Sequence, residues 1–217
     1  MKTAAIDTAT ELLNIALEVD ERRYCVSLDI GLRHSESLIP ALDGLLRLAG
    51  TDRSLDLLVC MRGPGSFTGL RIGMATVKGL ASALGCPFVA VATLDVLASG
   101  MEFSPGAVVP VLDAKKGRVF AAVYSGGKKE SGDLDIPPEA LVRLLSTRES
   151  VLFTGSGAPL LADHLASHPG WRIDRRRSVG AALALLDLGK ERLAASGGEP
   201  EDLGPLYLRP SEAEPGG

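Results

Sequence analysis

Cysteine is scarce in this chain of 217 residues, and its pattern excludes two classes of site. Cys25, Cys60 and Cys86 are odd in number, far apart, and form no C-x-x-C pair. This spacing fits reduced thiols in a cytosol better than a disulfide framework or a zinc site. We therefore expect no metal.

Long hydrophobic runs are also missing. No run approaches the roughly 18 apolar residues that a membrane-spanning helix needs, and Asp7 interrupts the apolar start of the chain before a signal-peptide core can form. We expect a soluble, cytoplasmic protein with no membrane contact.

There is no excess of positive charge either. The 23 Lys and Arg residues are outnumbered by 27 Asp and Glu, which gives a net charge of −4. Tight binding of tRNA or DNA by phosphate neutralisation is a poor fit for this chain alone, so any contact with tRNA is expected only through a complex. With 46% hydrophobic and 23% charged residues, the chain is expected to be globular.

The remaining elements can be placed around one stretch, residues 55–85. An apolar run at 55–61 has the length of a strand, and the Gly-Pro-Gly turn at 63–65 stops it. Ser66 and Thr68 can cap the helix that follows, and Gly85 is a plausible end for it. The order is strand, turn, helix.

The small residues of this helix need an explanation, because each interior glycine costs roughly 0.8–1 kcal/mol relative to alanine. Ala75, Gly79 and Ala83 recur every four residues, as do Gly69 and Gly73, so another backbone could approach closely along these lines. Two interpretations stay open: a contact helix for a partner, or a core helix packed tightly on its own sheet.

The other elements repeat one order. Strands are expected at 3–7, 12–19, 24–28, 88–91, 108–113, 119–124, 151–154 and 171–173. Helices are expected at 35–49, in a short segment capped by Thr93, and at 138–145, 158–166 and 179–195, the last capped by Ser178. Both halves run strand, strand, strand, helix, strand, helix, strand, helix, with a weak third strand within 126–135 in the second. This order predicts an α/β protein with two lobes, 1–103 and a smaller 104–217 whose tail could pack back on the first. Each lobe is a mixed sheet covered by helices, as in the actin-like and ribonuclease-H-like fold.

A resemblance to a known family rests on the Gly63–Gly73 motif, GPGSFTGLRIG. It continues in Ile6–Glu11 and His34–Glu36 and in three short later segments, which are 78–81, 113–116 and 207–209. Together these closely resemble the bacterial TsaB (YeaZ-like) family of tRNA threonylcarbamoyladenosine biosynthesis proteins. The departures are small: Ala9 stands where serine is usual, and Phe120 where tyrosine is common.

The resemblance implies a non-catalytic subunit. TsaB-like proteins pair with the catalytic subunit TsaD and, with the ATPase TsaE, help to form threonylcarbamoyladenosine beside the tRNA anticodon. The family shares the fold of TsaD but lacks its active site, so no catalytic residue and no required cofactor are expected, although weak ATP or ADP binding at the complex is conceivable. A homodimer is expected in isolation.

We expect the partner surface on the helices at 35–49 and 69–84. The first has more leucine than one sheet face needs, and the second has the small-residue line. The predicted interface residues are Leu38, Leu42, Leu45, Arg71, Met74, Ala75, Lys78 and Gly79.

The glycine-rich turn does not match a phosphate-binding template. A Walker A loop needs lysine where Leu70 stands, and G-x-G-x-x-G would need glycine at Thr68. Any nucleotide cleft would be vestigial, formed by Asp7, Thr8, Gly63, Gly65, Ser66 and Asp113, with the turns after Asp7 and Asp113 facing each other between the lobes. The alternative function is a weak nucleotide-dependent enzyme of the actin-like superfamily.

The other candidate residues have simpler interpretations. His34 lacks a second histidine at metal-binding spacing, so a helix start or an interface is favoured. His164 and His168 are expected at the polar edge of a helix, and Arg175, Arg176 and Arg177 in a solvated turn. No serine, cysteine or metal constellation for proteolysis can be assembled.

Overall fold

The computed structural model, which describes residues 1–31, 33–101, 103–176 and 178–209, consists of two units, and the chain visits each of them twice. Among the described residues, the first unit comprises 1–96 and 179–206, and the second comprises 97–178 and 207–209. The single boundary expected after residue 103 therefore differs from the structure. The reason is that the last helix packs on the first sheet, with which it has no continuity in sequence.

The first unit is built on a five-stranded sheet in the order β3-β2-β1-β4-β5. Its strands are β1 (Thr3–Asp7), β2 (Leu12–Val19), β3 (Arg22–Asp29), β4 (Leu57–Gly63) and β5 (Phe88–Ala92). The first three form an antiparallel meander, and β1, β4 and β5 run parallel. Both β1 and β2 are buried along their whole length, as expected for strands covered on both faces.

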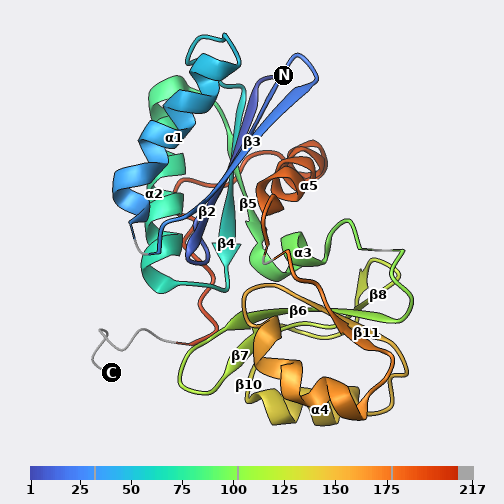
Figure 1. The fold of residues 1–217 in the computed structure, drawn as a ribbon. Helices are drawn as coiled ribbons and strands as arrows, with labels where there is room; N and C mark the ends of the chain where they lie inside the picture. The colour runs from blue at the N-terminus through green and yellow to red at the C-terminus, as the bar shows by residue number, and fades with distance from the viewer. Residues whose placement is uncertain (32, 102, 177, 210–217) are drawn as a thin grey trace. The chain divides into compact units, whose positions relative to one another are not determined.

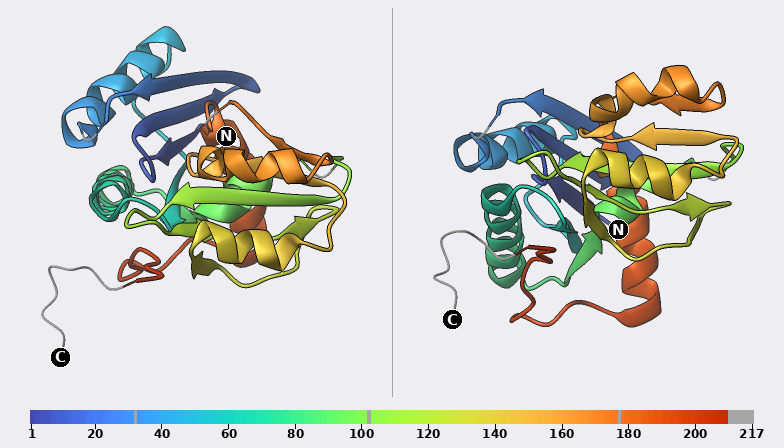
Figure 2. Two further views of the ribbon diagram at one scale, coloured as in Figure 1. Left: turned by 60° about the horizontal axis from the view of Figure 1, so that its bottom comes forward. Right: turned by 90° about the horizontal axis from the view of Figure 1, so that it is seen from below.

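Helices cover both faces of this sheet (Figures 1 and 2). On one face, α1 (His34–Leu48) and α2 (Phe67–Leu84) pack with residues such as Ile6 and Leu58 in one core. On the other face lies α5 (Ala181–Ser196), which contacts β1, β2, β4 and β5. A Cβ on Gly189 of α5 would lie 2.5 Å from the Val59 methyl groups, so this glycine lets the helix sit close to the sheet.

The N-terminal end of α5 differs from the sequence prediction. The helix begins at Ala181 after Gly180, whose φ is 80°, and no side chain caps it from the N-cap position. The prediction that Ser178 caps this helix is wrong, since its hydroxyl is buried with no hydrogen-bond partner. After α5 the chain runs back along the first unit, where Glu199 N donates to Phe88 O at 2.8 Å and Leu206 N to Arg62 O at 2.7 Å.

The second unit has its own mixed sheet, whose main path is β10-β7-β6-β11-β12. Its strands are β6 (Ala107–Asp113), β7 (Val119–Ala121), β8 (Tyr124–Ser125), β9 (Lys128–Lys129), β10 (Leu134–Ile136), β11 (Val151–Thr154) and β12 (Trp171–Ile173). The strand expected at 119–124 is divided, because β7 pairs with one end of β6 and β8 with the other. Phe153 and Trp171 meet edge to face in the core, with ring centroids 5.4 Å apart.

Three short helices complete the described chain. α3 (Thr93–Ala98) spans the passage from the first unit to the second, and α4 (Pro138–Leu145) has the expected bounds. The helix expected at 158–166 is instead a 3-10 helix, η1 (Ala158–Ser167), with proline near its start. None of the helices in the described ranges is long and apolar enough to cross a membrane.

Candidate functional site

The turn after β1 packs against the N-terminal half of α2. Thr8 is buried, and its hydroxyl donates to the carbonyl oxygen of Gly69 at 2.8 Å. A Cβ on Gly69 would overlap the Thr8 carbonyl oxygen, and a Cβ on Gly73 would overlap Thr8 Oγ1. At these two positions the interpretation of α2 as a tightly packed core helix is confirmed, because the glycines leave room for another segment of the same unit.

The space around the Gly-Pro-Gly turn before α2 is also occupied by other segments of the same protein. Ser66 N donates to Ala9 O at 2.7 Å, and a Cβ on Gly65 would lie 2.6 Å from that same oxygen. Gly63, with a φ of 120°, faces the carbonyl of Leu206 so closely that no side chain would fit. Ser66 Oγ accepts from Gly69 N at 3.3 Å, which confirms Ser66 as the cap of α2.

The structure thus brings together the first-unit members of the predicted cleft: Asp7, Thr8, Gly63, Gly65 and Ser66. Their close contacts are with one another and with the chain around them. An anion at a helix N-terminus needs free N–H groups and an open backbone. Here the Gly69 N–H is bonded to Ser66, and the approach is occupied by the turn after β1.

Asp7 is the buried ionisable group of this turn, with only 1% of its surface exposed. Its Oδ1 accepts from Ala9 N at 2.9 Å and its Oδ2 from Asn14 Nδ2 at 2.8 Å. Burial raises the pKa of Asp7 to about 6, although both hydrogen bonds act in the opposite direction. Both carboxylate oxygens are engaged within the protein, so Asp7 holds the turn in place.

Asp113 ends β6 of the second unit and makes a similar but more exposed turn. Its Oδ1 accepts from Lys115 N at 2.7 Å, and its Oδ2 lies 3.0 Å from Lys115 Nζ. Lys115 and Lys116 both have positive φ, 60° and 53°. That Asp7 and Asp113 face each other across a cleft stays a prediction. No group of three or more His, Cys, Asp or Glu residues suited to a metal ion occurs in the described parts of the chain.

Four of the eight predicted interface residues are not on the surface. Leu38, Leu42, Leu45 and Met74 are only 1–6% exposed and belong to the core beneath α1 and α2. Their assignment to a partner surface is wrong, because the regular apolar stripe of each helix faces its own sheet.

The other four residues lie on the outer side of α2 or near it. Arg71, Ala75 and Gly79 are exposed, and the space around Gly79 is open, since a Cβ added there would have no atom within 4 Å. Arg71 stacks its guanidinium over the Phe67 ring at 3.8 Å. Lys78 is half-buried and donates from Nζ to Leu203 O at 3.1 Å, so it also holds the returning tail.

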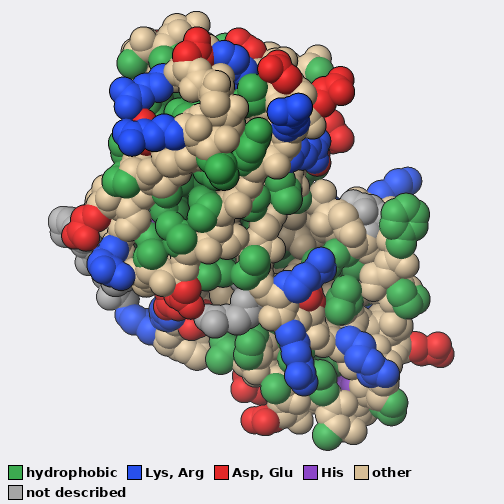
Figure 3. Space-filling view, turned by 45° about the horizontal axis from the view of Figure 1, so that its top comes forward, with side chains coloured by type: hydrophobic (Ala, Val, Ile, Leu, Met, Phe, Trp, Pro, Cys, Tyr) green, Lys and Arg blue, Asp and Glu red, His purple; other side chains and the backbone are tan. Residues whose placement is uncertain are grey.

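Exposed apolar side chains that the sequence analysis missed lie on the same two helices. Ile39 and Leu48 of α1 are 48% and 71% exposed, and Leu84 at the end of α2 is 38% exposed. In Figure 3, hydrophobic side chains gather in the middle of the visible face of the first unit, below a rim of charged ones. The helical spacing in the sequence could have identified two of them as exposed, because Ile39 and Leu48 each fall outside the Leu38, Leu42, Leu45 stripe.

His34 and His168 have structural roles. His34 is the first residue of α1, is buried, and has Nε2 2.8 Å from Thr10 O. The prediction of a helix-start histidine is confirmed. His168 stacks on Trp171 with centroids 3.8 Å apart, and its Nδ1 lies 2.9 Å from His164 O at the end of η1.

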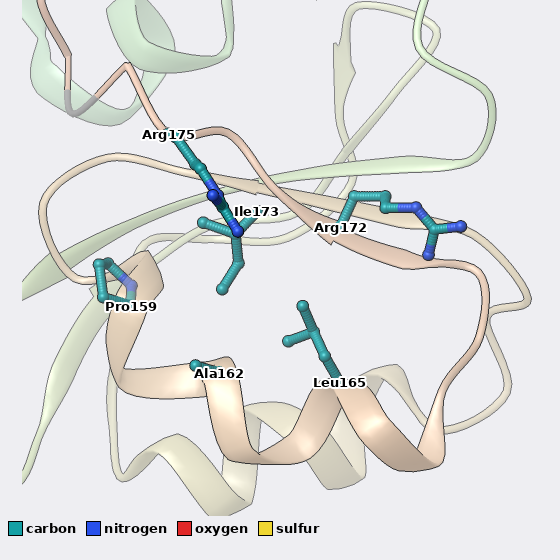
Figure 4. A pocket seen from close by; sticks show the side chains of 6 residues that line it. All are labelled: Pro159, Ala162, Leu165, Arg172, Ile173 and Arg175. Atoms are coloured by element: carbon teal, nitrogen blue, oxygen red, sulfur yellow. The ribbon is translucent and has the colours of Figure 1, made fainter.

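The predicted arginine turn follows β12. Arg175 and Arg176 are exposed, as expected, and Arg176 pairs with Asp174 at 3.0 Å, while Arg177 lies outside the described residues. A pocket of about 470 Å³ opens between η1 and β12 (Figure 4). Arg172 and Arg175 lie at its edges, and its lining is otherwise aliphatic: Pro159, Ala162, Leu165 and Ile173.

All three cysteines are free, in agreement with the expectation of reduced thiols. Cys60 is buried in β4, and burial raises the pKa of its thiol to about 12. Cys25 is exposed on the edge strand β3.

Comparison with known proteins gives results of three kinds. Residues 30–147 match the family model of TsaD, described as tRNA N6-adenosine threonylcarbamoyltransferase. The tRNA threonylcarbamoyladenosine biosynthesis protein TsaB of Bacillus subtilis is 31% identical, over 99% of this chain and 96% of that protein. The structure of YeaZ from Pseudomonas aeruginosa has a TM-score of 0.79 at 28% identity, covering 95% of this chain and 99% of that one.

A more distant structural neighbour bears on the fold alone. A Bacteroides thetaiotaomicron protein of unknown function, described as having an actin-like ATPase fold, has a TM-score of 0.51 at 10% identity. It covers 86% of this chain and 95% of its own. The α/β fold of actin-like type that the element order predicted is confirmed.

Proposed function

We propose, from the premise that this chain belongs to the TsaB family, that it is a non-catalytic subunit in the synthesis of threonylcarbamoyladenosine on tRNA. Its relatives carry that biosynthesis in their names, and the matching family model is that of the threonylcarbamoyltransferase TsaD. The proposed partners are a TsaD homologue, in a heterodimer, and a TsaE-type ATPase. tRNA is contacted through the complex.

One observation carries the non-catalytic part of the proposal. The glycine-rich start of α2, where a helix N-terminus could otherwise receive an anion, is covered by Thr8, which packs against Gly69 and Gly73 and is held by a buried hydrogen bond. A subunit whose helix start is covered in this way would contribute by binding its partner proteins and not by catalysis. No cofactor is needed for such a role, although weak ATP or ADP binding at the complex is compatible with it.

The proposed contact surface is the exposed side of α2 that carries Ala75 and Gly79, extended by exposed apolar side chains of the same two helices, which are Ile39, Leu48 and Leu84. It combines exposed apolar side chains with a place on α2 where no side chain stands in the way. Apolar surface of this kind is buried in stable protein interfaces. In the absence of TsaD, two copies of this chain can cover the same surface, so a homodimer is expected.

The test is co-purification of the cognate TsaD homologue with Gly79→Leu. Nothing lies within 4 Å of a Cβ at Gly79, so the chain itself tolerates the substitution, and leucine raises helix propensity by up to about 1 kcal/mol. The variant should melt at or above the wild-type temperature, yet lose TsaD binding and dimerisation. Gly132→Leu, at an exposed glycine of the second unit with equally open space, is the matched control.

The outcomes separate the possibilities. A folded Gly79→Leu protein that still dimerises and still binds TsaD would refute this surface. A variant that is globally destabilised would place Gly79 in a packed environment, which also contradicts the proposal.

A further inference from the structure

A row of four polar groups crosses the first unit from β1 to the start of α5. Asn14 Nδ2 donates to Asp7 Oδ2 at 2.8 Å, Ser27 Oγ donates to Asn14 Oδ1 at 2.6 Å, and Gly180 N donates to Ser27 Oγ at 3.1 Å. Asp7 and Asn14 are buried, and Ser27 is half-buried. One hydrogen-bond chain therefore joins the turn after β1 to a helix more than 160 residues later in the sequence.

The direction of this chain is determined at both of its ends. A backbone N–H can only donate, so Ser27 Oγ must accept from Gly180 and is free to give its own hydrogen to Asn14. Asn14 then presents its NH₂ group to Asp7, which suits an ionised carboxylate because that group only accepts. Every member is satisfied in this one arrangement.

A proton on Asp7 competes with this arrangement. On the lone pair of Oδ2 that accepts from Asn14 NH₂, or on the lone pair of Oδ1 that accepts from Ala9 N–H, the proton would meet a second donor. Rotation of the Asn14 amide by half a turn resolves the first conflict. Its oxygen then accepts from Asp7 and its NH₂ donates to Ser27, whose hydroxyl hydrogen must turn away from Asn14, toward Cys25, with which Ser27 also interacts.

We propose that Asp7, Asn14, Ser27 and Gly180 form a two-state hydrogen-bond chain, through which protonation of Asp7 is transmitted to the N-terminal end of α5. In the second state Ser27 Oγ accepts from both Asn14 NH₂ and Gly180 N–H, so the acceptor of the Gly180 N–H is shared and its hydroxyl hydrogen points elsewhere. The proton comes from solvent and stays on the Asp7 carboxyl, so no other group is consumed. This proposal is independent of the proposed function.

The position of Gly180 determines which part of the protein the hydrogen-bond chain affects. The N-terminal end of α5 has no side-chain cap of its own, so the contact with Ser27 is a long-range substitute. Gly180 lies two residues after Ser178, where the polypeptide returns from the second unit to the first. The charge state of a buried carboxyl is thus linked to the segment through which the chain re-enters its first unit.

Other groups around Asp7 must be separated from it in any pH experiment. The titratable and charged groups on the neighbouring elements include Glu18 on β2, Arg23 and Cys25 on β3, His34 on α1, Cys60 and Arg62 on β4, Arg71 and Lys78 on α2, and Asp187 and Lys190 on α5. Burial raises the pKa of both cysteine thiols above the ordinary range of a thiol, so they stay neutral throughout the titration. Asp187 and Lys190 are paired with side chains of β3 and β2. His34 is ionisable, and a variant that keeps it while removing Asp7 is therefore required.

The experiment is an NMR titration of the full chain from about two pH units below to two above the Asp7 midpoint. Selective labelling reports the Asp7 carboxyl carbon and the Gly180 amide nitrogen together. Both should move with one midpoint, near the pH of about 6 at which Asp7 titrates. In Ser27→Ala, Asp7 should still titrate while the Gly180 amide no longer follows it. In Asp7→Asn, which retains His34, the Gly180 response should vanish.

Asp113→Asn is the matched control. Asp113 accepts a hydrogen bond from the backbone N–H two residues later in the sequence, just as Asp7 does. This variant should leave the Gly180 response unchanged. A Gly180 amide that stays fixed while wild-type Asp7 titrates overturns the proposal. So does a Gly180 titration that persists in Asp7→Asn or Ser27→Ala. The wild-type and Ser27→Ala titrations decide the matter even if Asp7→Asn does not fold.

Discussion

The substitution Gly73→Ala tests the claim that the glycines of α2 have different roles. On an exposed helix, alanine in place of glycine stabilises by roughly 0.8–1 kcal/mol. At Gly73, however, the new Cβ would overlap Thr8 Oγ1. The Thr8 hydroxyl would have to turn away and give up its 2.8 Å hydrogen bond to Gly69 O, in a place where Thr8 is only 2% exposed.

The sizes of these energetic effects predict whether Gly73→Ala stabilises or destabilises the protein. A buried hydroxyl left without a partner costs about 1–3 kcal/mol, and overpacking of a core site costs about 1–3 kcal/mol. Against a gain of about 1 kcal/mol in helix propensity, Gly73→Ala should lower the free energy of unfolding by roughly 1–5 kcal/mol. Gly79→Ala, on the same helix but in open space, should raise it by up to about 1 kcal/mol.

Urea unfolding of the two variants, with Thr8→Ala and the double variant Thr8→Ala/Gly73→Ala, completes a cycle. Because Thr8→Ala removes the overlapping oxygen, the double variant should recover much of the stability lost by Gly73→Ala, so that the two changes are strongly non-additive. The reasoning is refuted if Gly73→Ala is as stable as Gly79→Ala, or if the effects of Thr8→Ala and Gly73→Ala simply add.

Three further predictions concern the same region. Because folding raises the pKa of Asp7 from 3.8 to about 6, the folded state holds the proton more tightly. The stability from this group is present below about pH 4 and is lost as pH rises through 6, by up to about 3 kcal/mol. Calorimetry across that range should show this fall in wild type and its absence in Asp7→Asn, whereas parallel profiles would contradict the shift. The isolated protein should release phosphate from ATP no faster than background, and turnover that disappears in Asp7→Ala would support the enzyme alternative. With iodoacetamide at neutral pH, mass spectrometry should show Cys25 alkylated well before Cys60, whose thiol is buried; equal rates would contradict the packing of β4.

The sequence predicted best what local chemistry determines. The strand, turn and helix from 55 to 85 follow from an apolar run, two glycines around a proline, and a serine cap. The structure confirms α2 with Ser66 and Gly85 at its ends. These signals act within a few residues, so they do not depend on how the rest of the chain folds.

What the sequence could not determine is which surface each pattern faces. The Leu38, Leu42, Leu45 stripe indicates an apolar helix face, but the same spacing serves a core or a partner, and here the core takes it. The contact of Gly69 with Thr8 joins residues 61 positions apart, and no local signal announces it. Ser178 was a reasonable cap by residue type, yet its φ of 65° and the later start of α5 depend on where the chain re-enters the first unit.

That re-entry has a consequence for synthesis of the protein on the ribosome. The sheet of the first unit is covered on one face by α5, which supplies Ala182, Leu185 and Leu186 to the interior and is not made until the second unit has been translated. At 5–20 residues per second, residues 97–178 take roughly 5–15 s to appear. During that time Ala5, Leu57 and Val59, all fully buried in the finished protein, lack their covering helix. The second unit, by contrast, has its core strands complete by residue 173 and can close first. A nascent chain of this fold therefore passes through a stage in which its later part is finished and its earlier part still exposes one apolar face, the kind of surface that chaperones recognise.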